Sequence, residues 1–190
     1  MIRKSELKLV KQDSEILLNP PKRFDFDGEI DSEMFSNIMI DKMRELGGFG
    51  LSANQVGVDT KMFVMGVGET TFSIFNPEIV STSKEEVSLD EGCLSFPGIY
   101  IKVLRPVSVN VRFQDVKGKS REETLTGLTA RIFLHEYDHM MGFTFKDRAS
   151  RLKWDLAYHR MVRRTKKIIR KGVQKQLINI AREIKKYDRL

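Results

Sequence analysis

The 190-residue sequence has one cysteine, Cys93, and no apolar run near the ~20 residues that a membrane-spanning helix needs. A single cysteine excludes an internal disulfide framework, so a reducing, cytoplasmic setting is expected. The N-terminal residues lack the apolar core of a signal peptide, and their acidic residues argue against a transit peptide. The chain also has no internal repeat and no low-complexity tract. We therefore expect a globular protein with no membrane partner.

Acidic residues are scarce towards the end of the chain. Residues 146–190 hold 16 Lys and Arg against 4 Asp and Glu, a net charge of +12, whereas the remaining residues carry a net −5. Apolar residues recur there at helical spacing and predict a helix that is kinked or split at Gly172. The stripe consists of Ile169, Val173, Leu177, Ile180 and Ile184. The basic charge favours a polyanionic partner, RNA above all, and the plain alternative is a solvated helix face.

Hydrophobic periodicity predicts an α+β domain with a C-terminal helical extension. Residues 31–46 read as a core-facing helix that Asp31 or Ser32 caps and two glycines end, after an extended lead-in over residues 1–30. Extended runs are predicted over 61–67, 70–77, 78–90 and 103–115, and a hairpin turn leads from the last into 120–127. We expect residues 1–150 to form the catalytic domain, and residues 151–190 to form an extension that is not an independent domain.

The most informative stretch is LHEYDHMMG, residues 134–142. On a helix, His135 and His139 project from one face, where two imidazoles can hold a metal ion while the carboxylate of Glu136 reaches a water bound to it. The alternative is chance spacing of two core histidines. A catalytic site needs a third ligand, for which a carboxylate, His159 and Cys93 are candidates. A lone cysteine is also commonly just a small buried hydrophobe.

Glycine concentrates in GFGLSANQVG, residues 48–57. This density means that the backbone turns tightly there or lets another group come close. The stretch is not a phosphate loop, since it has no Gly-Lys-Ser/Thr and no strand leads into it. A plain loop between a helix and a strand is the alternative.

Taken together, GFGLSANQ, EGCLS and HEYDH resemble, in this order, the three signature motifs of the peptide deformylases. Ser52 alone departs from the first motif, where that family has alanine. The resemblance implies mostly antiparallel strands around a central metal-binding helix. It also implies that Cys93, His135 and His139 hold one divalent metal ion per chain, with Fe(II) as the natural metal and Zn, Ni or Co as substitutes.

The implied reaction is hydrolysis of the N-formyl group from the N-terminal methionine of a new polypeptide, with release of formate. Glu136 is expected to take a proton from the attacking, metal-activated water and to deliver it to the leaving amine. The Gln55 amide and the Leu94 backbone N–H are expected to face the developing oxyanion. Asp138 is expected to orient the site rather than bind the metal. The expected substrate-binding residues are Phe49, Gly50, Gly92, Leu128 and Ile132, with the His135 ring also beside the methionine pocket.

The expected partners are N-formylmethionyl nascent peptides and, as a hypothesis, the ribosome through the basic C-terminal helix. Two other functions compete with this interpretation. A general zinc peptidase would share the His-Glu-x-x-His helix but would not need EGCLS or the glutamine loop. An RNA- or ribosome-binding protein on a retired catalytic core would not need Glu136.

Overall fold

The structure is a computed structural model that describes the backbone of residues 3–187 and the side chains of residues 3–66 and 68–176. Short runs of β-branched and aromatic residues form its larger sheet. Its spatial order is β1-β2-β3-β6-β7, and all neighbouring strands pair antiparallel. The strands are β1 (Gly50–Ser52), β2 (Met62–Val67), β3 (Thr70–Thr82), β6 (Ser108–Gln114) and β7 (Ser120–Thr126). The second sheet is a hairpin of β4 (Glu86–Cys93) and β5 (Phe96–Pro106).

Two of the predicted strand boundaries are wrong. The expected single run over 78–90 is divided, because β3 continues through Pro77 to Thr82 and β4 begins only at Glu86. Pro77 is tolerated inside β3 because the pairing with β6 shifts register between Phe75 and Glu78. The run over 103–115 is likewise two strands of different sheets, interrupted after Pro106. Alternation alone does not reveal such a change of partner.

The predicted helix over 31–46 is confirmed as α2 (Ser32–Glu45). Asp31 is its N-cap, and its Oδ1 accepts a hydrogen bond from the Met34 backbone N–H at 2.7 Å. Its core-facing side chains Phe35, Met39 and Met43 are buried, and Gly47 follows its end with a φ of 69°. The helix therefore covers the larger sheet from one side, packing on β1 and β2.

The lead-in before α2 is less extended than predicted. It contains a 3₁₀ turn at Lys4–Glu6 and the single-turn helix α1 (Glu15–Leu18). Further along, the Asn76 side chain holds the lead-in at Phe24, accepting from its backbone N–H at 2.7 Å and donating to its carbonyl at 3.0 Å. These two hydrogen bonds hold the lead-in against the sheet, next to the contact between the Phe24 and Phe75 rings.

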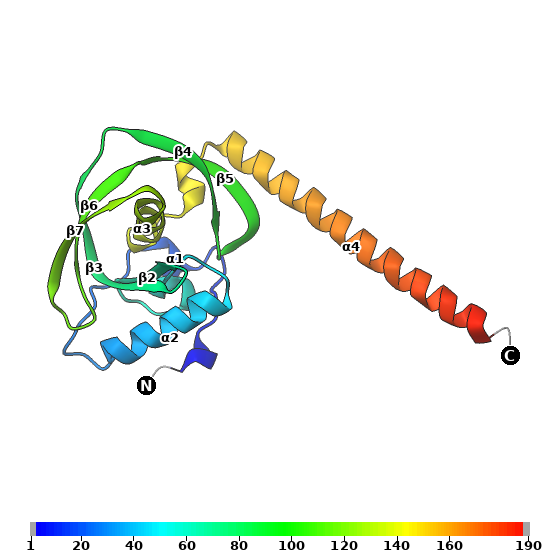
Figure 1. The fold of residues 1–190 in the computed structure, drawn as a ribbon, viewed down its shortest axis with the longest axis horizontal. Coiled ribbons are helices and arrows are strands. Elements are labelled where there is room, and N and C mark those ends of the chain that lie inside the picture. The colour runs from blue at the N-terminus through cyan, green and yellow to red at the C-terminus, as the bar shows by residue number, and fades with distance from the viewer. Residues whose placement is uncertain (1–2, 188–190) are drawn as a thin grey trace. The chain divides into compact units, whose positions relative to one another are not determined.

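Helix α3 (Gly127–Met140) lies at the centre of the compact unit Met1–Ala149, with strands of both sheets around it (Figure 1). Thr126 is its N-cap residue, although its side chain makes no capping hydrogen bond. Phe133 is fully buried and packs edge-on against Phe63 of β2, with the ring centroids 5.3 Å apart. The helix is thus anchored to the sheet by one face, which leaves another face free to carry polar groups.

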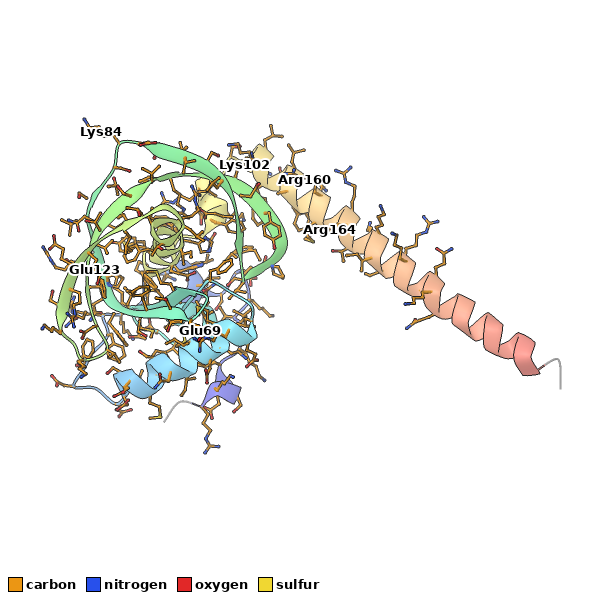
Figure 2. The ribbon with its side chains drawn as sticks, in the orientation of Figure 1. Glu69, Lys84, Lys102, Glu123, Arg160 and Arg164 are labelled. Atoms are coloured by element: carbon orange, nitrogen blue, oxygen red, sulfur yellow. The ribbon has the colours of Figure 1, made fainter. Side chains whose placement is uncertain are left out.

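The chain divides into two compact units, Met1–Ala149 and Ser150–Leu190. The second unit contains α4 (Arg151–Tyr187), which is continuous through Gly172, so the predicted split there is wrong. Ile169 and Val173 are exposed on it, while the other predicted stripe side chains, Leu177, Ile180 and Ile184, lie outside the described residues. Arginines 160 and 164 project from the helix (Figure 2). None of the helices in the described part of the chain is apolar over a length that could cross a membrane.

Candidate metal centre

Cys93, His135 and His139 converge at one buried point. Their potential ligand atoms all lie within 4.8 Å of one another, and Cys93 Sγ is 3.4 Å from His139 Nε2. The two imidazole rings come from successive turns of α3, with centroids 5.4 Å apart. A thiolate and two imidazoles suit Fe(II) or Zn(II), and three protein ligands leave a coordination position open for a reacting molecule. The residues present therefore fit a catalytic metal ion.

Cys93 reaches this point because it ends β4, just before the Leu94–Ser95 turn into β5. The pairing shifts register between Gly92 and Cys93, which is the usual sign of a bulge that redirects a side chain. At Gly92 a Cβ atom would lie 2.8 Å from the Tyr100 ring. A glycine before the cysteine thus lets the two strands stay close where the sulfur turns inward.

Glu136 lies beside the ligands with its carboxylate fully inside the protein. Its Oε2 has no hydrogen-bond partner among the described residues, although the side chain is buried. A Cβ atom at Gly50 would lie only 2.3 Å from Glu136 Oε1, so the glycine of the first motif makes room for this carboxylate. Burial raises the pKa of Glu136 to about 7, against the opposing influence of charged His135 and Arg105. A carboxyl group with that pKa exchanges protons readily near neutral pH.

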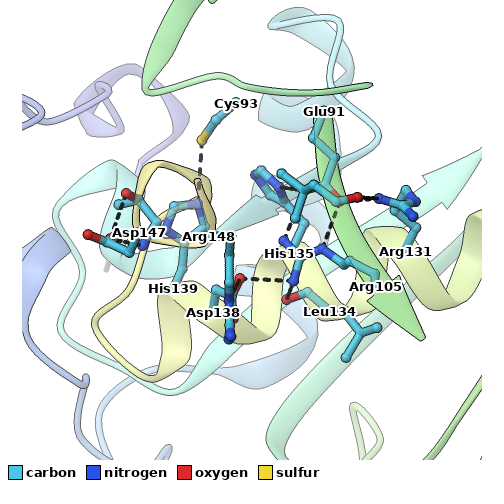
Figure 3. A network of polar contacts seen from close by, with 12 residues as sticks. Glu91, Cys93, Arg105, Arg131, Leu134, His135, Asp138, His139, Asp147 and Arg148 are labelled. Atoms are coloured by element: carbon cyan, nitrogen blue, oxygen red, sulfur yellow. Dashed lines mark hydrogen bonds and ion pairs between the residues drawn. The ribbon is translucent and has the colours of Figure 1, made fainter. Parts of the chain in front are cut away.

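Glu91 orients His135 through a contact with the ring nitrogen Nδ1 (Figure 3). Its Oε2 is 3.0 Å from His135 Nδ1, which leaves Nε2 of that ring for a metal. Arg105 donates to both carboxylate oxygens, at 2.7 and 2.9 Å, and Arg131 donates to Oε1 at 2.7 Å. Burial alone would raise the pKa of Glu91, but the hydrogen bonds from Arg105 and His135 outweigh it and lower the pKa to about 2. Glu91 is therefore an anion at neutral pH.

Asp138, on α3 with the two histidines, completes this network. Arg105 Nη1 donates to its Oδ2 at 2.9 Å, and Arg148 donates to both of its oxygens. The predicted orienting role of Asp138 thus has a physical basis, since this carboxylate ties α3 to the guanidinium that also holds Glu91. The sequence analysis did not identify Arg105, Arg131 and Arg148 as parts of the site. Only the pattern around Arg105 points to a buried charge, because it stands in β5 at a position whose alternating neighbours are buried and apolar.

The two histidines differ in their affinity for protons. Burial would lower the pKa of His135, but its contacts with Cys93 and Glu91 raise the pKa to about 10. Burial, aided by the charge of His135, lowers the pKa of His139 well below the ordinary value. His139 is thus a neutral ligand as it stands, whereas binding of a metal at His135 must displace a proton.

A cavity of about 520 Å³ opens beside the ligands and reaches the surface. Every catalytic, metal-binding and substrate-binding residue predicted from the sequence lines it except His139, whose Nε2 lies 3.4 Å from Cys93 Sγ. The lining includes Phe49, Gly50, Gln55, Gly92, Leu94, Leu128, Ile132 and Glu136. Phe49 and Leu128 are more than half exposed, at 59% and 53%, so they form the rim, whereas Ile132 is buried in the wall. Such a volume suits a small molecule or a peptide end.

Gln55 links the glycine-rich segment to the cysteine. It belongs to the 3₁₀ turn Ala53–Val56 that directly follows β1, and its Nε2 donates to Cys93 Sγ at 3.4 Å. Asn54, next to it, donates through Nδ2 to the His139 carbonyl at 2.8 Å. The stretch is therefore a strand and a 3₁₀ turn rather than a plain loop, and its polar side chains form hydrogen bonds with Cys93 and His139.

Comparison with known proteins agrees with this geometry. The family model for polypeptide deformylase matches residues 6–154. The peptide deformylase of Thermotoga petrophila is 38% identical over 148 residues, which cover 78% of this chain and 80% of that protein. That of Treponema pallidum (strain Nichols) is 41% identical over 134 residues, 70% of this chain and 83% of that protein.

Solved structures give the same result. The crystal structure of peptide deformylase from Thermotoga maritima matches with a TM-score of 0.72 at 35% identity, covering 76% of this chain and 97% of that one. A peptide deformylase from Legionella pneumophila matches with a TM-score of 0.76 at 35% identity, covering 86% of this chain and 98% of that one. The family match thus covers nearly all of the compact unit Met1–Ala149.

Proposed function

The chain belongs to the polypeptide deformylase family of hydrolytic enzymes, and we propose on that basis that it removes the N-formyl group from the N-terminal methionine of newly synthesised polypeptides, releasing formate. One observation carries the proposal: Cys93, His135 and His139 converge next to the buried carboxylate of Glu136, whose Oε2 has no hydrogen-bond partner among the described residues. A metal site adjoining a proton acceptor is the arrangement that metal-dependent amide hydrolysis uses. The cytoplasm, where such chains are made, is the proposed setting.

The three converging residues would hold one divalent ion per chain. We propose Fe(II), with Zn, Ni or Co as substitutes, since a mixed thiolate and imidazole set accepts all of them. When bound, such an ion supplies Lewis acidity that lowers the pKa of water and polarises a carbonyl. Glu91 keeps the His135 ring turned so that Nε2 is available for this purpose.

Glu136 is the proposed proton carrier of the reaction. With a pKa raised to about 7, its carboxylate accepts the proton of the attacking water and later gives it to the amine that leaves. Its burial excludes solvent that would compete for that proton. Because Gly50 has no side chain, it leaves room for this carboxylate.

Gln55 and Leu94 are the proposed stabilisers of the oxyanion. The amide of Gln55 lies against Cys93, and Leu94 occupies the turn that follows that cysteine, so both border the reacting centre. A preorganised donor of this kind is typically worth about 3–4 kcal/mol in the transition state.

The cavity suggests how the substrate is placed. We assign the methionine side chain to its apolar side, formed by Ile132 and Leu128 with Phe49 at the rim. The peptide backbone would extend along Gly50 and Gly92, where the absence of side chains allows close approach.

Helix α4 supports a second part of the proposal, contact with the ribosome. Its described surface is strongly basic, and residues 151–176 contain one acidic residue, Asp155. A basic helix surface of this kind attracts RNA phosphates, and deformylation acts on chains that leave the ribosome. An RNA-binding protein on a retired core remains the competing function, and activity decides between them.

The test is formate release from formyl-Met-Ala-Ser by anaerobically purified protein, with the bound metal quantified. Glu136→Ala should reduce turnover by about 10²–10⁴-fold at unchanged metal content, while the exposed Glu123→Ala on β7 should behave as the parent. No formate from a metal-loaded parent would overturn the proposal. Cleavage of an internal peptide bond instead would identify a general peptidase.

A further inference from the structure

The Gln55 carboxamide is held at both ends inside the protein. Its Oε1 accepts two hydrogen bonds from Ser52, one from the backbone N–H at 2.9 Å and one from the hydroxyl at 3.0 Å. Its Nε2 donates to Cys93 Sγ at 3.4 Å and to Ser95 Oγ at 3.1 Å. All four side chains are buried, with Ser52 at 0% and Gln55 at 1% exposure. The amide is thus fixed between the first and second motifs.

The backbone N–H of Ser52 decides which end of the amide faces the sulfur. A backbone N–H can only donate, so it selects the oxygen of Gln55 and leaves the nitrogen for Cys93. A reversed amide would place its oxygen against the sulfur, where two acceptors would face each other. The Ser52 hydroxyl then adds a second bond to the selected oxygen and restricts rotation of the carboxamide.

We propose that Ser52 is a positioning residue that acts through Gln55, its hydroxyl holding the amide N–H against the Cys93 sulfur and at the edge of the cavity. The inference rests on the proposed function, since Gln55 is the proposed oxyanion donor. Ser52 is also the one residue at which the GFGLSANQ stretch departs from the deformylase motif. An alanine there would keep the orienting backbone N–H and lose the hydroxyl.

A competing explanation is that the contact is only a cap. Ser52 and Gln55 form a capping box on the turn Ala53–Val56, and such boxes stabilise a helical turn wherever they occur. A cap alone predicts a loss of stability in Ser52→Ala with an unchanged environment at the cysteine. The two explanations therefore differ in what the sulfur experiences.

The first measurement is the steady-state kinetics of Ser52→Ala on formyl-Met-Ala-Ser. Because a donor to the oxyanion acts in the transition state, kcat should decrease about fivefold, which corresponds to the ~1 kcal/mol of one hydrogen bond, while KM stays within about twofold. Ser36→Ala is the matched control. Ser36 is 4% exposed in α2, and its hydroxyl has no partner among the described residues, so the same deletion there should leave kcat unchanged.

The second measurement does not depend on activity. Both variants and the parent are loaded with Co(II), and the thiolate-to-cobalt charge-transfer absorption is recorded. A hydrogen bond to the sulfur stabilises its electrons, so a loosened Gln55 should shift this band to longer wavelength in Ser52→Ala and not in Ser36→Ala. Circular dichroism and thermal unfolding confirm that each variant is folded.

The band shift together with the lower kcat would support the positioning role. An unshifted band in Ser52→Ala would overturn it, whatever the kinetics, because a cap or general loosening would then account for the change. A raised KM at unchanged kcat would also overturn it. If the parent releases no formate, the proposed function fails, and the cobalt band still reports whether Ser52 holds Gln55 against the cysteine.

Discussion

Arginine side chains do opposite things in the two units of this molecule. Around Glu91, the side chains of Arg105 and Arg131 are only 4% and 7% exposed, and each pairs with the carboxylate at 2.7 Å. On α4, the Arg151 side chain is 96% exposed and reaches Asp155 only at 4.0 Å. The first group fixes the geometry of the candidate metal site, and the second spreads one sign of charge over a surface.

The difference shows that the effect of a charged side chain depends on its burial and on its partners. A buried guanidinium is costly unless its partners are complete, so the Glu91 network forms as a unit or not at all. An exposed arginine on a helix pairs weakly and remains available to a polyanion. Each of the following predictions compares a change in the buried network or active site with a change at an exposed position.

The largest effect is expected from Arg105→Met. The change leaves Glu91 and Asp138 without their shared partner, and breaking a buried pair in this way costs about 3–5 kcal/mol of unfolding free energy. Arg164→Met on α4, where the side chain is exposed, should change the free energy by less than about 0.5 kcal/mol. Urea unfolding of both variants measures this. Equal losses would mean that burial does not distinguish the two groups.

Acid should act on the same network with a smaller effect. The folded pKa of Glu91, about 2, lies below the ordinary 4.5, so its contribution to stability is complete above pH 4.5 and is lost as the pH falls through 2. For metal-free protein, the loss over this window should reach about 3 kcal/mol. Glu91→Gln should lack this part of the acid dependence, whereas Glu123→Gln on β7 should retain it. Urea unfolding at several pH values measures the slope, and the same slope in all three proteins would contradict the assignment.

The sequence could predict the three candidate ligands but not the residues that hold them in place. Cys93, His135 and His139 lie in short motifs whose residue types and order are recognisable along the chain. Arg105 and Arg131 stand 14 and 40 residues from Glu91, on a strand and a helix, and only the tertiary fold brings them to it. Local patterns do not contain that information.

The same limit applies to the elements of the fold. The helix over 31–46 was predictable because a cap, a periodic apolar face and a glycine stop agree with one another. The run over 103–115 was not, because the alternation continues while the chain passes from one sheet to another after Pro106. For α4, charge and periodicity predicted a helix, but the interior Gly172 suggested a break that the continuous helix does not have.

Substitutions of two glycines, Gly50 beside Glu136 and Gly172 on α4, extend the comparison between a buried and an exposed position. In Gly50→Ala, the new methyl group would meet Glu136 Oε1, and the strain of about 1–3 kcal/mol typical of overpacking should displace the carboxylate and reduce kcat about tenfold. At Gly172 nothing lies within 4 Å of an added Cβ, so Gly172→Ala should leave kcat unchanged and stabilise the helix by about 1 kcal/mol. Kinetics and thermal circular dichroism measure the two effects. An undiminished kcat in Gly50→Ala would contradict the close approach.

The smallest effect on catalysis is expected from removing charge on α4. Replacement of Arg160, Arg163, Arg164 and Lys167 by glutamine should leave kcat/KM for formyl-Met-Ala-Ser within about twofold, because these exposed side chains do not line the cavity. Binding to an RNA duplex should weaken instead, with the slope of log K against log salt reduced by about one for each phosphate that the helix no longer neutralises. A large loss of turnover would place part of the chemistry on α4 and remove the distinction between the two groups of arginines. Unchanged RNA binding would mean that these charges are only solvated and do not contribute to binding, since an electrostatic attraction to phosphates must weaken when the charges are removed.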